Sequence, residues 1–458
     1  MTTSDTKTGE AEAVSTAAAA AKTQRYGHLE LGFTTRMEQP LPQGTARYTP
    51  GAFNPLPPDG SGWQRLGTVY CNNHDPVVMV KDHSPQRDLL KAPARFEKAA
   101  DLWASLAGGG HRLVATVWRP VPPSSDYVAV GVYITPAGTS PSTGDVVCVK
   151  KTHSGRTYAR RGELSLPVTA HSLFNGLRYN VAPLYPHGDA EEHLILPVGT
   201  LSYTAVEDPS PQETTWLLDL PAVVEKFEGP DTPDLENYNS PPERTMITDR
   251  AVTVPFYMVA DPARTAHWKA ENSPFYKILR KRQFRLVRHV DFRGSGAGQI
   301  SESVEQGVSK ETSEEFSVKT GITVGVSVGV EASAKPFGMG ASTTVTTSVS
   351  TSIEMGYSSR YGVTSMESKT VGVTYNVPAG HAGALWSESH ELIPVRADGG
   401  MVTSGNLKFD NGSYIGRTHP YSDQRPPEVT DLTAAQDGHA TKHLWEIPDE
   451  PASQRKTD

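Results

Sequence analysis

The chain has 458 residues, a length that allows two or three domains with hydrophobic cores of their own. Its 37% hydrophobic and 21% charged residues exclude a wholly disordered chain and an integral membrane protein. No apolar run reaches the roughly 18 residues of a transmembrane helix. A net charge of −8 argues against bulk nucleic-acid binding.

Residues 1–24 are polar and Ala-rich, and they lack a basic start followed by an apolar core. They therefore predict a disordered leader rather than a Sec signal peptide, so any export uses another route. The two cysteines, Cys71 and Cys148, lie in the strand-like runs VYCNN and VVCVK. Two cysteines do not make a disulfide framework, and buried free thiols are favoured over a bridge between them.

Three proline-rich segments recur in the first half of the chain, and a glycine follows each one. The segments and the pairs that hold the glycines are FNPLPP (53–58) with Leu66–Gly67, WRPVPP (118–123) with Val130–Gly131, and VAPLYP (181–186) with Val198–Gly199. Proline marks strand edges because it lacks an N–H, whereas glycine marks a bend or a close backbone approach. The pattern predicts a pseudo-threefold, β-prism-like domain of three repeats over 25–225. The alternative is a chance recurrence among Pro-rich loops of an irregular β-domain.

The middle repeat carries a family resemblance. VATVWRPVPPSSDYVAVGVYI, followed by VVCVKK, resembles the family named vacuolar protein sorting-associated protein 62. The resemblance rests on the W-x-P-x-P-P signature, the following aromatic residue and Val–Gly pair, and the later Val-rich strand. It covers residues 26–225 and implies a fold more than a mechanism. By analogy, β-prisms often bind sugars or lipids.

Residues 226–270 are rich in Pro, Asp and Glu and predict a linker. A new unit begins at NSPFYKILRKRQFRLVRHVDF (272–292), where six basic side chains crowd together. They are Lys277, Arg280, Lys281, Arg282, Arg285 and Arg288. Such a stretch can attract anionic lipid head groups, but a solvated face of a strand or helix is the favoured interpretation.

From Gly298 to Trp386 the chain is rich in Ser, Thr, Val and Gly, and strands are expected throughout. Its centre alternates strictly between apolar and polar residues, which is typical of a strand with two unlike faces. The apolar set of the first arm is Ile322, Val324, Val326, Val328, Val330, Ala332 and Ala334. The segment KPFGMG (335–340) predicts a turn. The second arm, 341–353, has Val345, Val349 and Ile353 on one face.

These two arms predict a hairpin that crosses a membrane. Both reach the about 9–11 residues of a transmembrane β-strand, and a closed barrel requires several copies of the hairpin. Phe337 and Met339 at the turn would cross first, and Glu331 and Glu354 would line the lumen. A half-buried hairpin in an ordinary β-sandwich gives the same alternation. The length of the run, its Ser and Thr content and the apolar turn favour the membrane interpretation.

Residues 270–420 as a whole resemble the aerolysin-type pore-forming proteins. The resemblance rests on NSPFY, the long Ser/Thr-rich strands with their hairpin, and the VPAG turn (377–380) within GYSSRYGVTSMESKTVGVTYNVPAGHAGALW (356–386). It implies an elongated β-module over 271–420 that starts as a soluble monomer, binds a receptor, assembles and inserts. Together with the N-terminal repeats it makes the expected fold all-β. The polar residues 421–458 predict a flexible tail.

No motif of catalysis or metal binding stands out. GVSVG (325–329) matches the G-x-S-x-G elbow, but it lies inside the alternating strand rather than at a strand-to-helix turn. GSGAG (294–298) has no βαβ context, and neither H-E-x-x-H nor C-x-x-C occurs. We therefore expect no enzymatic activity, no cofactor and no metal site.

The leading hypothesis is a pore-forming toxin or defence protein. It would be soluble, released by a non-Sec route, and located in the target-cell membrane after insertion. Its expected partners are the target membrane, reached through a glycan or lipid receptor, and further copies of itself, with no nucleic acid. The alternatives are a non-lytic membrane- or glycan-binding adaptor and an enzyme on a β-rich scaffold.

Overall fold

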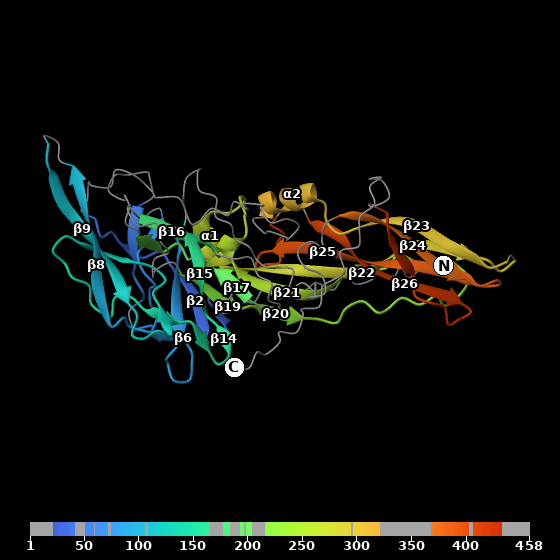
Figure 1. Ribbon diagram of the computed structural model, residues 1–458, viewed down its shortest axis with the longest axis horizontal. Coiled ribbons are helices and arrows are strands. Elements are labelled where there is room, and N and C mark those ends of the chain that lie inside the picture. The colour runs from blue at the N-terminus through green and yellow to red at the C-terminus, as the bar shows by residue number, and fades with distance from the viewer. Residues whose placement is uncertain are drawn as a thin grey trace, which may run out of the picture.

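The computed structural model describes residues 22–41, 51–58, 60–71, 75–105, 109–164, 177–183, 193–196, 198–203, 216–294, 296–320, 368–402 and 406–432. Within these ranges the chain is nearly all β, which confirms the fold class predicted from the sequence. The molecule is elongated, with the N-terminal sheets gathered at one end and long strands running to the other (Figure 1).

Three consecutive units of antiparallel strands form the N-terminal part. The first holds β1 (Gln24–Tyr26), β2 (Leu29–Thr34), β3 (Met37–Glu38), β4 (Gly51–Pro55), β5 (Val69–Cys71) and β6 (Val77–Asp82). The second holds β7 (Leu90–Lys91), β8 (Arg95–Ser105), β9 (His111–Val121), β10 (Tyr127–Val128), β11 (Tyr133–Pro136) and β12 (Cys148–Lys150). The third holds β13 (Thr152–His153), β14 (Arg156–Thr157), β15 (Ala159–Leu164), β16 (Leu177–Pro183), β17 (His193–Leu196), β18 (Leu201–Tyr203) and β19 (Trp216–Pro221). Each unit closes an early strand on its last strand, in the pairs β2–β6, β7–β12 and β15–β19.

The three units meet at an approximate threefold axis. Thr68 donates its backbone N–H to the carbonyl of Val132 (2.8 Å), and Val132 donates to the carbonyl of Leu201 (2.7 Å). Leu201 donates back to the carbonyl of Thr68 (2.8 Å), which closes a ring of backbone hydrogen bonds. Each unit therefore presents the same strand to the next. The pseudo-threefold arrangement is present in the backbone, whereas the β-prism name for it remains a prediction.

Strand register shows which prolines are equivalent. Immediately after the ring residues, the paired positions are Phe53 with Val69, Trp118 with Tyr133, and Arg178 with Ser202. Counting forward from these pairs makes Pro183 the equivalent of Pro58 and Pro123. The sequence pattern aligns Pro186 with them instead, and that alignment is wrong. A longer connection separates the paired strands of the third unit, so spacing alone does not fix its register.

Two of the motif glycines lie where a side chain would collide. A Cβ on Gly67 would lie 2.8 Å from the carbonyl oxygen of Val132, and a Cβ on Gly131 would lie 2.9 Å from the carbonyl oxygen of Leu201. The predicted close backbone approach is therefore confirmed at these two positions. Gly199 instead has a φ of +73° and open surroundings, so it is a turn residue.

Long antiparallel strands build the second part of the molecule. One sheet has the order β20–β21–β22–β25–β26, and another has the order β23–β24–β27. The bounds are β20 (Val223–Lys226), β21 (Ile247–Pro255), β22 (Phe275–Asp291), β23 (Gly298–Gln306), β24 (Lys369–Val377), β25 (Ala382–Val395), β26 (Leu407–His419) and β27 (Glu428–Asp431). The helices are η2 (Phe256–Met258), α1 (Ala266–Asn272) and α2 (Lys310–Thr320). The predicted VPAG turn joins β24 to β25, with Gly380 at φ +77°.

Three sequence predictions are corrected by these elements. The expected linker 226–270 contains β21, an inner strand whose Val252 and Val254 are buried. The expected tail 421–458 contributes β27, which pairs with β24, while its residues 433–458 lie outside the described ranges. Residues 310–320 form a helix rather than a strand. Pairing with other strands decides the structure of β21 and β27, which local composition does not reveal.

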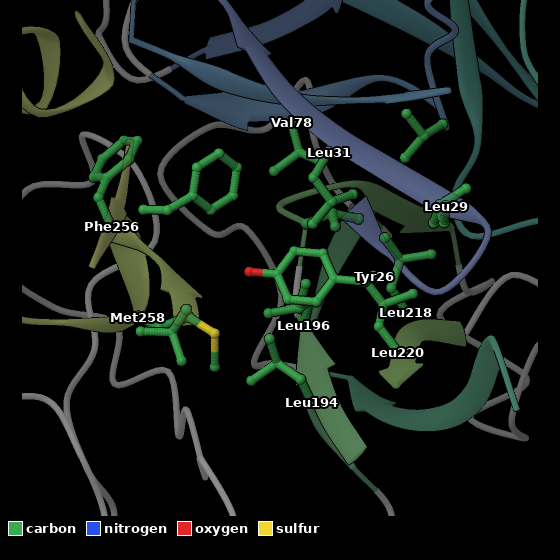
Figure 2. Close-up of a cluster of buried hydrophobic side chains, with 14 of the residues drawn as sticks. Tyr26, Leu29, Leu31, Val78, Leu194, Leu196, Leu218, Leu220, Phe256 and Met258 are labelled. Carbon is green, nitrogen blue, oxygen red and sulfur yellow. The ribbon is translucent and has the colours of Figure 1, made fainter. Parts of the chain in front are cut away.

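One hydrophobic core joins the two parts. The buried Tyr26 donates its hydroxyl to the carbonyl of Thr253 in β21 (3.2 Å). The ring of Phe33 lies 5.0 Å from that of Phe256, between centroids. Figure 2 shows Tyr26 and its leucine neighbours facing Phe256 and Met258. The N-terminal units are therefore packed directly on the end of the long-stranded part.

Cys71 and Cys148 are both buried and free, as the sequence predicts. Burial raises the pKa of the Cys148 thiol to about 12 and also raises the pKa of the Cys71 thiol. Both side chains therefore behave as small apolar groups rather than as reactive thiolates.

Candidate membrane-inserting module

The predicted hairpin connects α2 to β24, and its residues lie outside the described ranges. They are Ile322, Val324, Val326, Val328, Val330, Ala332, Val345, Val349 and Ile353 of the arms, Phe337 and Met339 of the turn, and Glu331 and Glu354 of the expected lumen. Their assigned roles therefore remain predictions. The residues that flank the segment can be described in detail.

Both flanks of the segment are anchored to the fold. Thr320 at the end of α2 is buried, and its carbonyl accepts the N–H of Ala260 (2.7 Å). Ser368, just before β24, donates its N–H to the carbonyl of Val308 (3.0 Å). Val308 lies between β23 and α2, and β23 pairs with β24. The two flanks of the segment thus lie at the end of α2 and beside the start of α2.

Helix α2 is capped at its start and packs on the body of the protein through side chains that include Phe316. Ser309 caps the helix because its hydroxyl accepts the N–H of Thr312 (3.1 Å). Among the helix side chains that the structure describes, Phe316 is the one large buried apolar group. Burying a phenylalanine contributes about 1.5–3 kcal/mol. Of the α2 side chains that the structure describes, Ser313 and Thr320 are buried together with Phe316.

The basic stretch of the sequence is strand β22, and acidic residues of neighbouring strands pair with it. The exposed or half-buried pairs are Lys277–Glu225 (2.6 Å), Arg282–Glu388 (3.1 Å), Arg285–Asp410 (2.6 Å) and Arg288–Glu302 (3.5 Å). Arg280 is buried and bonds both carboxylate oxygens of Asp249. Five of the six cations therefore pair with carboxylates of the same chain. This agrees with the face of a structural strand rather than with attraction to lipid.

The loop that anchors α2 contains a buried ion pair. Asp261 accepts hydrogen bonds from Nε and Nη2 of Arg396 (2.7 and 2.8 Å) and from the hydroxyl of Tyr276 (2.7 Å). Burial alone would raise the pKa of Asp261, but these hydrogen bonds and the Arg396 charge outweigh it and lower the pKa. Asp261 adjoins Ala260, the donor to Thr320. The ion pair therefore positions the anchor of α2.

A cleft of about 650 Å³ opens beside the start of α2. Its charged lining consists of Arg285, Lys408, Glu305 and Asp410, two cations and two anions. Asp410 already accepts hydrogen bonds from Arg285 (2.6 Å) and from Ser387 (3.0 Å). The two cations balance the two anions, and the Asp410 carboxylate is already hydrogen-bonded. The cleft therefore favours neither an anionic nor a cationic ligand.

No helix in the described ranges is long and apolar enough to cross a membrane. Across the same residues, no three His, Cys, Asp or Glu side chains gather closely enough to hold a metal ion.

Sequence reasoning missed α2 and the Asp261–Arg396 pair. The helix had a local signal, because Ser309 precedes KETSEEFSVKT, whose Glu and Lys residues favour helices. The ion pair had none, because its members are 135 positions apart and meet only through tertiary packing.

Comparison with known proteins matches residues 247–406 to the family described as insecticidal crystal toxin, P42. That region is about a third of the chain and contains most of the predicted aerolysin-like module. The match to a toxin family therefore lies in the second half of the protein. The resemblance of residues 26–225 to the vacuolar protein sorting-associated protein 62 family receives no support from this match and remains a prediction.

Two solved structures are similar to parts of the chain. GNIP1Aa from Chromobacterium piscinae is 18% identical with a TM-score of 0.27, over 39% of this chain and 34% of that one. The chain thus spans about a third of the length of GNIP1Aa. Cry35Ab1 is 14% identical with a TM-score of 0.29, over 72% of this chain and 89% of that one. No curated protein matches the chain.

Proposed function

We propose that this protein is a pore-forming toxin or defence protein that binds a target membrane, oligomerises and inserts a β-hairpin. The observation that carries the proposal is the strict alternation of residues 322–334, followed by the Ser/Thr-rich arm 341–353. Both arms lie inside the region 247–406 that matches an insecticidal toxin family. The pattern suits a strand with lipid on one side and water on the other.

The anchored flanks support this proposal. A segment that moves into a membrane must leave the soluble fold without unravelling it. Thr320 and Ser368 are tied to Ala260 and Val308 by backbone hydrogen bonds. The strands of the pairs β22–β25 and β23–β24 are hydrogen-bonded to one another, so we expect them to persist when the segment between these anchors moves.

The hydrogen-bonding needs of a backbone in lipid require several copies of the chain to assemble. In lipid every N–H and C=O must be satisfied within the protein, so one hairpin cannot remain inserted alone. Several copies of the chain must therefore contribute hairpins to one closed barrel. We propose a soluble form before insertion, release by a non-Sec route, a glycan or lipid receptor, and no enzymatic activity of its own.

Val326→Arg tests the insertion step. The change places a charge on the lipid face near mid-span, at a cost of about 2–4 kcal/mol in known barrels, repeated in every subunit. We expect dye release from vesicles or target cells to fall at least tenfold while membrane binding persists. Ser327→Arg is the matched control, because it puts the same charge on the neighbouring polar face.

Equal dye release from wild type and Val326→Arg would show that this face does not meet lipid. The non-lytic membrane- or glycan-binding adaptor would then be the better interpretation. Rings of the protein on membranes in electron micrographs would support the pore instead.

Glu331 and Glu354 predict the selectivity of the pore. Repeated around a ring, they give the lumen negative charge, which favours cations. In planar bilayers the reversal potential should show cation preference, and Glu331→Gln should reduce it. An anion-selective wild-type pore, or an unchanged reversal potential in the variant, would exclude this lining.

A further inference from the structure

The hairpin formed by β8 and β9 lies at the end of the molecule opposite the long strands (Figure 1). Near its turn, Trp103 is 52% exposed and sits directly across from Leu113. Trp103 is the exposed member among the tryptophans that the structure describes; the others are half-buried or buried. Leu113 is half-buried and belongs to none of the described core clusters. The two side chains therefore form an apolar pair that the core does not use.

The backbone of the hairpin separates this pair from the core. Leu102 and Val114, the neighbours of Trp103 and Leu113, are 4% and 1% exposed and belong to one buried cluster. The register shifts between Leu102 and Trp103. Such a β-bulge re-aims the side chain beside it. Leu102 therefore points inward while Trp103 points outward.

Positive charge lies at the same end of the hairpin, where Arg112 stands opposite Ala104 on the other face of the two strands. His111 and Arg112 are exposed and directly precede Leu113. The ion pairs of this hairpin, Arg95–Glu97 and Lys98–Asp101, lie farther from the turn and do not involve Arg112. An exposed tryptophan, a half-buried leucine and a cation at one end of a hairpin match the chemistry of a bilayer interface with anionic head groups.

We propose that the β8–β9 tip, defined as Trp103, Arg112 and Leu113, is the surface with which the protein first enters the lipid interface. Trp103 and Leu113 would lie at the level of the head groups, where indole rings are preferred. Arg112 would contact lipid phosphates or carboxylates. The proposal rests on the proposed function in one respect, that the protein acts on membranes, and it names a contact site far from the predicted hairpin.

Flotation with protein-free vesicles tests the proposal, using phosphatidylcholine alone and phosphatidylcholine mixed with phosphatidylserine. Trp103→Ala should weaken vesicle binding about tenfold, because burial of a large apolar side chain is lost. Arg112→Gln should weaken binding about fivefold on the phosphatidylserine vesicles and little on the neutral ones. Phe227→Ala is the matched control, because Phe227 is 50% exposed elsewhere on the surface.

Two further measurements separate lipid contact from a folding defect. Trp103→Tyr should restore most of the binding, since tyrosine also favours the interface. Tryptophan emission should shift to shorter wavelength when vesicles are added to wild type, and Trp103→Ala should lose most of that shift. Unchanged circular dichroism would confirm that both variants are folded.

Binding by wild type only to membranes that contain proteins would overturn the proposal in favour of a protein receptor. Equal losses in Trp103→Ala and Phe227→Ala would also overturn it. A different result would refute the proposed pore. If vesicle binding depends on Trp103 but no dye is released, the pore is excluded and the contact site is supported. Dye release that is unaffected by Trp103→Ala would refute the contact site alone.

Discussion

Charged residues in this protein differ in what they contribute, depending on their burial. Asp261 and Arg396 are almost fully buried and bonded twice to each other, whereas Lys277 and Glu225 meet at the surface. Removing one member of a buried pair leaves the other charge without compensation in a poorly polarisable environment. A surface pair exchanges its partner for water at little cost.

Asp261→Ala should therefore destabilise the protein by about 3–5 kcal/mol, because the Arg396 guanidinium loses its carboxylate. The midpoint of urea unfolding at neutral pH measures the change. Lys277→Ala is the control and should cost less than about 1 kcal/mol. Equal shifts of the two midpoints would mean that the Asp261 pair does not stabilise the fold.

Acid stability depends on the same carboxyl groups. Burial opposes ionisation of Asp261 and Glu388, but hydrogen bonds and nearby cations outweigh it and lower the pKa of both. A carboxyl whose pKa is lower in the folded state stabilises the protein above its unfolded pKa of about 4. That contribution is lost as the pH falls through the lower, folded pKa. The melting temperature should therefore drop from about pH 5 downward, and Asp261→Asn should lessen the drop. A melting temperature that stays constant to about pH 3 would contradict this linkage.

At the scale of elements, strand pairing explains most successes and failures of sequence-based prediction. Repeated proline and glycine motifs predict the three N-terminal units because Gly67 and Gly131 lie at the axis, where a Cβ would collide with the neighbouring unit. β27 escapes prediction because its partner β24 is distant in sequence, whereas β21 pairs with the consecutive strands β20 and β22 and is hidden by the Pro-, Asp- and Glu-rich residues that precede it. All four residues of β27 are exposed, so no apolar pattern marks it. The candidate site is similar: alternation predicts its hairpin, whereas its anchors at Ala260 and Val308 depend on tertiary structure.

The axial glycines give a direct test of the three-unit arrangement. A Cβ on Gly131 would lie 2.6 Å from the Cβ of Thr200 and 2.9 Å from the carbonyl oxygen of Leu201. Gly131→Ala should therefore cost about 1–3 kcal/mol, as overpacking does in other cores. Gly144→Ala is the matched control, since its Cβ would approach only Ser142 Oγ, at 3.8 Å. Similar unfolding midpoints for the two variants would mean that the units do not pack closely at the axis.

At the scale of the whole molecule, the shared core makes the two parts one folding unit. The cluster that contains Tyr26 and Leu31 of the first part also contains Val254, Phe256 and Phe275 of the second. Separation of the parts would expose these side chains to water. The β8–β9 tip and the anchors at Ala260 and Val308 therefore belong to one frame, so we expect contact at the tip to set the orientation of the rest.

Tyr26→Ala tests this coupling. Tyr26 is fully buried, faces Phe256 and Met258 across the junction (Figure 2), and donates a hydrogen bond to Thr253. Its truncation should cost about 3–5 kcal/mol, as for other large aromatic side chains in cores. Because the loss falls on the junction, calorimetry should show one unfolding transition in wild type and two in Tyr26→Ala. Trp103→Ala, at the far end of the first part, should keep the single transition. Two transitions in wild type, or an unchanged single one in Tyr26→Ala, would mean that the parts unfold independently of this junction and that the tip does not orient the predicted hairpin.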